Sequence, residues 1–201
     1  MRLVTFGCSI TYGQSLPDTN WKKYGSITPP SKFAWPSQLA DILQVKVLNK
    51  AVPGAGNYLI AHQITNFKPK QNDIIIVMWS YKDRYNVITE DGDIDYDAHI
   101  HSTIGPWTKD ARTKAFYKYV YDEDDALIRS NHYINYAKLY LDTTNVKHFH
   151  TMAMNEKYTG VVNLNVNKIR KIDFGKDKSH PGPKSHLAIA EKIYDYIKED
   201  I

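Results

Sequence analysis

The chain has 201 residues, of which 42% are apolar and 24% are charged, a balance typical of a folded globular protein. The formal net charge is only +4, and basic and acidic residues are interspersed along the sequence, so we expect no nucleic-acid partner. A single cysteine excludes an intrachain disulfide framework and a cysteine-based zinc site, and favours a reducing compartment.

The sequence predicts neither a signal peptide nor a membrane span. Met1 leads directly into the short apolar segment 3–6, without the basic and long apolar regions of a secretory signal. The longest apolar run, Ile74 to Trp79, is too short to cross a bilayer. We therefore expect a cytoplasmic protein with no membrane partner.

The first eighty residues alternate between strand-like and helix-like patterns. The expected strands cover residues 2–6, 45–48 and 74–79, and the expected helices cover 35–43 and 58–67. The run 74–79 is apolar throughout, as in a strand that is covered on both faces. This alternation predicts an α/β fold, a three-layer sandwich with a central, mostly parallel sheet.

The second half of the chain is less regular. Residues 81–130 are polar and aromatic without a clean period, which predicts an irregular insertion with a helical piece near 111–119. Beyond it we expect a helix over 131–141, a strand over 146–154 and a final helix over 185–201. No linker interrupts the sequence, so residues 1–201 are expected to form a single domain.

Three short blocks, spread over nearly the whole chain, resemble the SGNH, or GDSL-type, hydrolase superfamily. Gly7-Cys8-Ser9 resembles the family's Gly-Asp-Ser block, with cysteine in place of aspartate. The segment from Asn49 to Gly54 resembles the second block, and Asp177-Lys178-Ser179-His180-Pro181 resembles the last. The resemblance implies a flavodoxin-like sheet, an esterase or acylhydrolase activity and no cofactor.

The chemistry of these residue types supports the same interpretation. A serine hydroxyl becomes a nucleophile when a base takes its proton, and histidine is suited to that role near neutral pH. His180 would activate Ser9, and Asp177 would orient the imidazole from the same loop. All three are predicted to lie at the carboxyl edge of a parallel sheet, where ligands bind in such folds.

The oxyanion that forms during acyl transfer needs donors that already point at it. In the SGNH architecture these would be the backbone N–H groups of Ser9 and Gly54. The third family block, Gly-x-Asn-Asp, corresponds to residues 80–83, where Lys82 stands in the position of the oxyanion-hole asparagine. Asn57 and Asn86 are candidate substitutes for that donor.

Each candidate also fits a structural role. The alternatives are a helix N-cap for Ser9, a surface loop for His180, a solvated charge cluster for Asp177 and a plain turn for Gly54. His186, a competitor for the base, is expected to pack or cap at the last helix, and Cys8 is expected to be a buried small hydrophobe. Residues 82–84 are expected to form surface ion pairs, with an anionic substrate group as the alternative.

Other aromatic and histidine residues have weaker interpretations. Trp107 and the rings of 116–121 are expected to pack in the core of the insertion, with a lid or a sugar-stacking wall as the alternative. His99 with His101, and His148 with His150, have a spacing that places both rings on one face of a strand. Without a convincing carboxylate or cysteine partner, neither pair predicts a metal site.

The sequence therefore predicts a serine ester hydrolase that acts through an acyl-serine intermediate. The resemblance implies a small-molecule or carbohydrate ester as substrate, with removal of O-acetyl or short acyl groups. Two alternatives stay open: a weak or inactive SGNH-like module for carbohydrate binding or structure, and an acyltransferase that uses the same serine. The oligomeric state does not follow from the sequence.

Overall fold

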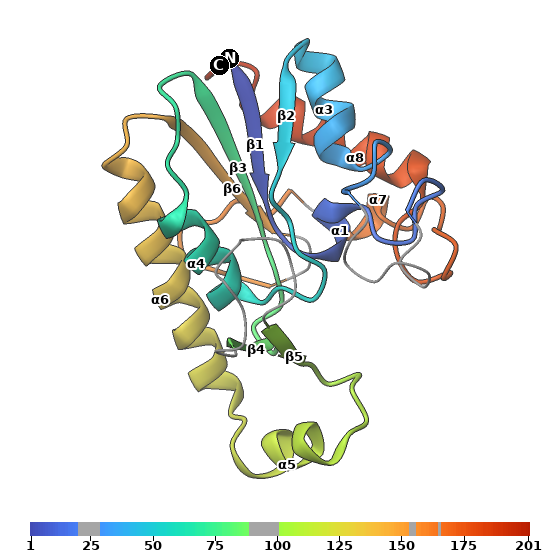
Figure 1. Cartoon of the computed structure of the whole chain (residues 1–201), viewed down its shortest axis with the longest axis vertical. Helices are drawn as coiled ribbons and strands as arrows, with labels where there is room; N and C mark the ends of the chain where they lie inside the picture. The colour runs from blue at the N-terminus through green and yellow to red at the C-terminus, as the bar shows by residue number, and fades with distance from the viewer. Residues whose placement is uncertain (20–28, 89–100, 153–155, 165) are drawn as a thin grey trace.

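The computed structural model describes residues 1–19, 29–88, 101–152, 156–164 and 166–201. Its main sheet has four parallel strands in the order β2-β1-β3-β6 (Figure 1). These strands are β1 (Arg2–Phe6), β2 (Lys46–Asn49), β3 (Asp73–Trp79) and β6 (Lys147–Met152). The predicted parallel sheet is confirmed; the last two residues of the strand predicted over 146–154 lie outside the described residues.

Helices cover both faces of this sheet (Figure 1). On one face, α4 (Asn57–Asn66) packs against α6 (Glu123–Asp142); on the other, α3 (Trp35–Leu43) packs against α8 (Pro183–Ile197). The short helix α1 (Ser9–Tyr12) follows β1, and α7 (Val166–Ile169) packs against α8. The predicted three-layer α/β sandwich is therefore confirmed.

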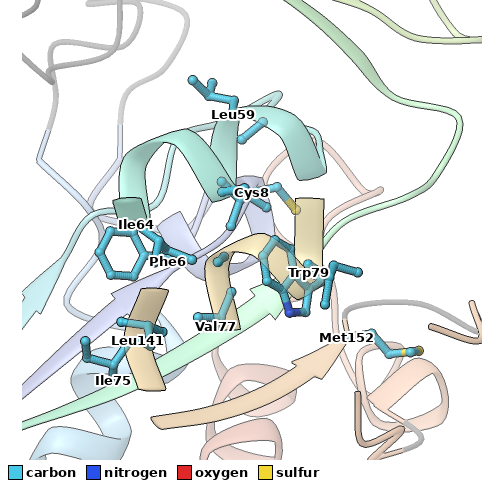
Figure 2. Packing of buried hydrophobic residues seen from close by; sticks show 14 of the residues in the cluster. Phe6, Cys8, Leu59, Ile64, Ile75, Val77, Trp79, Leu141 and Met152 are labelled. Atoms are coloured by element: carbon cyan, nitrogen blue, oxygen red, sulfur yellow. The ribbon is translucent and has the colours of Figure 1, made fainter. Parts of the chain in front are cut away.

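Alternate residues of the central strands feed two separate cores. The core under α4 and α6 receives the β1 and β3 side chains of Val4, Phe6, Ile75, Val77 and Trp79 (Figure 2). The core under α3 and α8 receives Leu3, Ile74, Ile76 and Met78. All seven residues of β3 are buried, because both of its faces are covered by helices. This explains the unbroken apolar run in the sequence.

The segment predicted to be an irregular insertion contains regular elements. Strands β4 (Tyr85–Ile88) and β5 (His101–Ile104) pair antiparallel outside the main sheet, and α5 (Ala111–Tyr119) is the predicted helical piece. Helix α6 begins eight residues before the predicted start at 131, because the Asp122 carboxylate caps it by accepting the Asp125 N–H at 2.9 Å. The acidic run without a clean period is a helix N-terminus.

Among the described residues, no helix combines the length and the apolar character that crossing a bilayer requires.

A chain of ring contacts runs from the core to the surface at the edge of the main sheet. The Trp79 Nε1–H donates to His150 Nδ1 at 3.1 Å, and the two rings stack at 5.9 Å. His150 Nε2 lies 3.0 Å from His148 Nδ1, whose other ring nitrogen lies 3.0 Å from Asp142. The two histidines do share one strand face, as their spacing predicts. Burial, together with His148 and Lys138, lowers the pKa of His150 to about 3.

We expect His150 to make the fold sensitive to acid. The pKa of His150 is about 3 in the folded protein against an ordinary value of 6.5, so the unfolded chain binds a proton first as the pH falls. The effect of His150 on the free energy of unfolding is therefore absent above pH 6.5. Between pH 6.5 and pH 3 it lowers that free energy by on the order of 4 kcal/mol. Urea unfolding across this range measures the slope.

The matched comparison is His150→Asn, which keeps an acceptor for the Trp79 N–H but has no titrating ring. Its stability is lower at neutral pH, because the ring stacking is lost, yet it depends less on pH than that of the wild type. The His132→Asn change, which removes an exposed imidazole outside this chain of ring contacts, serves as the control. An equal slope in His150→Asn and wild type would contradict the prediction.

Candidate active site at the carboxyl edge of the sheet

Ser9 is the first residue of α1 and follows directly from the carboxyl end of β1. The N-cap of α1 is Cys8, whose side chain makes no capping hydrogen bond. The alternative in which Ser9 caps this helix is therefore wrong. Ser9 is 7% exposed. At Gly7 a Cβ atom would lie 2.2 Å from Thr11 Oγ1 and 3.0 Å from the Met78 carbonyl oxygen. The tight turn that presents Ser9 therefore requires glycine at this position.

Asp177 and His180 form a short, oriented pair in the loop before α8. His180 Nδ1 lies 2.6 Å from Asp177 Oδ2, and the backbone N–H of His180 donates to Asp177 Oδ1 at 3.0 Å. The Ser179 N–H donates to the same Oδ1 atom at 3.0 Å. Because the carboxylate occupies Nδ1, the hydrogen bonds of the described residues leave His180 Nε2 available to a nucleophile.

The surroundings of Asp177 favour its ionised form. Partial burial alone would raise the pKa of the carboxyl. The hydrogen bonds from the His180 and Ser179 backbones, the His180 ring and the Ser15 hydroxyl outweigh burial and hold the pKa well below its ordinary value. The carboxylate is therefore charged at any pH near neutrality and can stabilise a protonated imidazole.

Two segments from opposite ends of the sequence interlock at this point. The Ser15 hydroxyl donates to Asp177 Oδ2 at 2.8 Å, and the Lys176 N–H donates to the Ser15 carbonyl at 2.8 Å. Lys176 Nζ also donates to the carbonyl of Pro17 at 2.8 Å. Ser15 lies six residues after Ser9, so these bonds bring the loop of Asp177 and His180 to the turn that follows the candidate nucleophile.

No hydrogen bond joins the Ser9 hydroxyl to His180 among the residues that the structure describes. Catalytic hydrogen bonds are often long in unliganded enzymes and shorten when substrate binds. The backbone places both residues at the same edge of the sheet, and the contact between Ser15 and Asp177 links their loops. The loop of Asp177 and His180 is thus held against the segment that begins six residues after Ser9.

Gly54 lies on a turn that runs beside the Ser9 loop. The β1–β2 pairing continues past the strands, with the Lys50 N–H donating to Thr5 at 2.8 Å and the Val52 N–H to Gly7 at 3.0 Å. Gly54 has φ of +83°, a left-handed conformation that suits glycine. The turn and the Ser9 loop therefore meet at the carboxyl ends of neighbouring strands.

Asn57, the candidate additional oxyanion donor, holds the end of β3 in place. Its Oδ1 accepts the Ser80 N–H at 2.8 Å, and its Nδ2 donates to the Tyr158 hydroxyl at 3.0 Å. The Tyr158 hydroxyl in turn donates to the Ser80 carbonyl at 2.6 Å. Asn57 is 2% exposed, so its amide is engaged in fixing the backbone where β3 leaves the sheet.

Lys82 is fully occupied by two carboxylates. Its Nζ lies 3.0 Å from Glu123 Oε1 and 3.1 Å from Glu156 Oε2. Burial opposes the charge, but the two glutamates outweigh it and raise the pKa of Lys82. The expectation of ion pairing is confirmed for this residue. Lys82 therefore joins the segment after β3 to the start of α6.

Arg84 lies between two aromatic rings, over Tyr81 at 5.5 Å and over Trp107 at 4.8 Å, while its Nη1 donates to the Ala55 carbonyl at 3.1 Å. Trp107 is 53% exposed, so the expectation that it packs within a core is wrong. The neighbouring Asp83 carboxyl has a raised pKa, because it is buried. Phe116, Tyr117 and Tyr121 do pack on one another.

His186 and Cys8 have the structural roles that were expected. His186 is fully buried, and its Nδ1 accepts the N–H of Trp35 at 3.1 Å, which caps the first turn of α3. Burial lowers the pKa of His186 to about 4. Cys8 is 1% exposed and lies in the core under α4 (Figure 2). Neither residue competes with His180 or Ser9 for the site.

The sequence does not predict the hydrogen bonds by which three polar residues support the candidate site. Ser15 bonds to Asp177, while Asn86 and Thr103 bond to the Gly54 turn. The sequence predicts Asn86 only as a direct donor. A hydroxyl or amide in a polar segment carries no signal for a partner that lies tens of residues away. His99 lies outside the described residues, and His101 belongs to β5.

Comparisons with solved structures find a similar fold in several proteins that are described as esterases. An acetyl xylan esterase, Est2A, from the rumen bacterium Butyrivibrio proteoclasticus matches with a TM-score of 0.57 at 15% identity, over 98% of this chain and 63% of that one. A carbohydrate esterase family 2 enzyme with a carbohydrate-binding domain from Corynascus thermopiles (Myceliophthora fergusii) matches with a TM-score of 0.56 at 13% identity, over 98% and 65%. The chain thus spans less than two thirds of either protein.

A third structure is of similar length. The psychrotrophic esterase EstA from Pseudoalteromonas sp. matches with a TM-score of 0.50 at 12% identity, over 98% of this chain and 97% of that one. No protein-family description matches the sequence, and no curated protein matches it. At these identities the likeness concerns the fold. The resemblance first seen in three sequence blocks is confirmed at that level: this chain has the α/β fold of the SGNH-type hydrolases.

Proposed function

We propose that the protein is a serine ester hydrolase in which Ser9 attacks the ester carbonyl and forms an acyl-serine intermediate. His180 takes the Ser9 proton through Nε2 and returns it to the leaving alcohol, whose C–O bond breaks. Water then attacks the acyl-serine, again with His180 as base, and releases the acid. Asp177 orients the ring and stabilises its charged form.

The single observation that carries the proposal is the contact of 2.6 Å between Asp177 and His180 Nδ1, held at the same sheet edge as Ser9. This contact sets the tautomer that a base needs, with Nε2 free to accept a proton. A loop histidine without catalytic function has no requirement for a carboxylate held by four hydrogen bonds.

The oxyanion would be bound by the backbone N–H groups of Ser9 and Gly54. A donor from Asn57 would add to them only through the second hydrogen of an amide already bonded to Tyr158. One oxyanion donor contributes roughly 3 kcal/mol, so an enzyme that lacks the asparagine donor at position 82 is expected to be slower by about two to three orders of magnitude.

For the substrate we propose O-acetyl or other short acyl esters of carbohydrates or small molecules. Support comes from the names of two structural neighbours, an acetyl xylan esterase and a carbohydrate esterase, each of which is longer than this chain. The fold alone does not determine the substrate. No metal or other cofactor has a step in this mechanism. We propose that the protein is cytoplasmic and that its partner is the ester substrate.

The direct test is covalent labelling. We expect a fluorophosphonate to add one phosphonyl group per chain and peptide mapping by mass spectrometry to place it on Ser9. The same preparation should hydrolyse a short-chain p-nitrophenyl ester, and prior labelling should abolish that hydrolysis. A label on any other residue would refute the assignment of the nucleophile.

Lys82 provides a specific reason to consider a binding module, because it stands where the family has its oxyanion-hole asparagine and is locked between two glutamates. That alternative predicts no label on Ser9 and no hydrolysis. An acyltransferase predicts a labelled Ser9 together with acyl transfer to an added sugar in preference to water. The labelling experiment, repeated with an acceptor sugar present, therefore distinguishes the three functions.

A further inference from the structure

The side chains of the β4–β5 pair reach out of their own sheet and bind the Gly54 turn. Asn86 of β4 and Thr103 of β5 are directly opposed in the antiparallel register. Asn86 is 3% exposed, and its Oδ1 accepts the Gly56 N–H at 2.5 Å while its Nδ2 donates to the Gly54 carbonyl at 3.2 Å. The Thr103 hydroxyl donates to the same Gly54 carbonyl at 3.0 Å.

These contacts form a closed network. Asn86 Nδ2 also donates to Thr103 Oγ1 at 3.2 Å, so each side chain fixes the orientation of the other. Because Thr103 Oγ1 accepts from Asn86, the hydroxyl proton of Thr103 is donated to the Gly54 carbonyl. The Gly54 carbonyl accepts from two donors, and the Gly56 N–H donates to Asn86 Oδ1. Together these bonds determine the orientation of the turn from Gly54 to Gly56.

The two sides of the turn are held by different parts of the fold. On the Ser9 side, the Val52 N–H donates to Gly7. On the opposite side, Asn86 and Thr103 bind Gly54 and Gly56, and the approach is so close that a Cβ on Gly56 would lie 2.9 Å from Asn86 Oδ1. A left-handed glycine has many alternative conformations, and this second set of bonds removes them.

We propose that Asn86 and Thr103 are positioning residues that keep the Gly54 turn in the conformation needed for oxyanion binding. The proposal rests on the proposed function, because it assigns them to the oxyanion hole of that reaction. It also changes the role first considered for Asn86. The amide of Asn86 is engaged with the turn, so it acts on the oxyanion through the backbone and not as a donor in its own right.

Substitutions at Thr103 provide the sharpest test, since valine has the shape of threonine without the hydroxyl and serine keeps the hydroxyl. We expect Thr103→Val to lower kcat about tenfold with KM changed less than about twofold, because the lost interaction matters mainly in the transition state. Thr103→Ser should restore most of kcat. Asn86→Ala, which removes contacts to two residues of the turn, should lower kcat about a hundredfold.

The control is Thr65→Val in α4, where, within the described parts of the chain, the hydroxyl bonds only to carbonyls of its own helix. Its kcat should equal that of the wild type. Thermal unfolding is measured for every variant, and Thr103→Val is compared at temperatures where it is folded. A folded Thr103→Val with wild-type kcat would overturn the proposal, as would a Thr103→Ser variant as slow as Thr103→Val.

Amide hydrogen exchange separates this inference from the proposed function. In Thr103→Val, the Gly56 amide, whose N–H donates to Asn86, should exchange at least several-fold faster than in wild type and Thr103→Ser. Unchanged exchange overturns the positioning role whatever the activity. Faster exchange in a protein whose wild type shows no Ser9-dependent hydrolysis supports the holding of the turn and refutes the hydrolase.

Discussion

Ser9→Ala is expected to lower kcat for ester hydrolysis by about four to six orders of magnitude, since it removes the atom that forms the acyl-enzyme. The remaining rate comes from oxyanion binding and orientation acting on a water molecule. The fold should be unaffected, because the Ser9 side chain neither caps α1 nor makes a hydrogen bond in the described structure. Burst kinetics with a p-nitrophenyl ester and single-turnover rates measure the loss.

Cys8→Ala is the matched control, because it changes the adjacent residue and the only other nucleophilic side chain in the Gly7-Cys8-Ser9 turn. Cys8 points into the core under α4 (Figure 2), so alanine there should lower stability by about 1 to 2 kcal/mol and leave kcat within a few-fold. A Cys8→Ala variant as inactive as Ser9→Ala would mean that the cysteine, or the packing beneath the turn, determines the rate.

Asp177→Asn is expected to lower kcat by about three to four orders of magnitude while preserving the loop. The asparagine Oδ1 can still accept the Ser179 and His180 backbone N–H groups. Its NH₂ group, however, must donate where Oδ2 accepted, so His180 Nδ1 becomes an acceptor and the proton moves to Nε2. A histidine with Nε2–H cannot take the proton of Ser9.

The pH dependence of the free energy of unfolding is a second measurement for Asp177→Asn. The pKa of Asp177 is lower in the folded protein than in the unfolded chain, so its contribution to stability is present above the unfolded value and is lost as the pH falls through the folded value. Asp177→Asn should therefore be less stable than wild type near neutrality, and the difference should shrink in acid. Asp195→Asn, on an exposed face of α8, is the control and should have wild-type kcat.

Much of the fold could be predicted because its signals are local. The β1 and β3 runs are apolar over contiguous residues, and α3, α4 and α8 show helical spacing, so each element can be recognised within its own window. The β4–β5 pair could not be found in this way. Its strands have four residues each, carry polar side chains, and are separated by twelve residues.

The candidate site was predictable to the extent that its residues lie in short motifs. Ser9, Gly54 and the Asp177–His180 pair each belong to a block that can be read within a few residues. Their supports cannot be read in this way: Ser15 and Asp177 are 162 residues apart, and Asn86 and Gly54 are 32 apart. Such contacts depend on how the elements pack, and a single sequence carries no record of that packing.

The hydrogen bonds between the Ser15 turn and the Lys176–Asp177 loop bear on which substitutions the fold can tolerate. The loop of Asp177 and His180 is tied to the segment after Ser9 by hydrogen bonds of Ser15 and Lys176, and none of these bonds involves residues 80–83 or the β4–β5 pair. Substitutions in those segments can accumulate without breaking these bonds. A chain built in this way can carry lysine at position 82, bound to Glu123 and Glu156, and still hold Asp177 against the segment that follows Ser9.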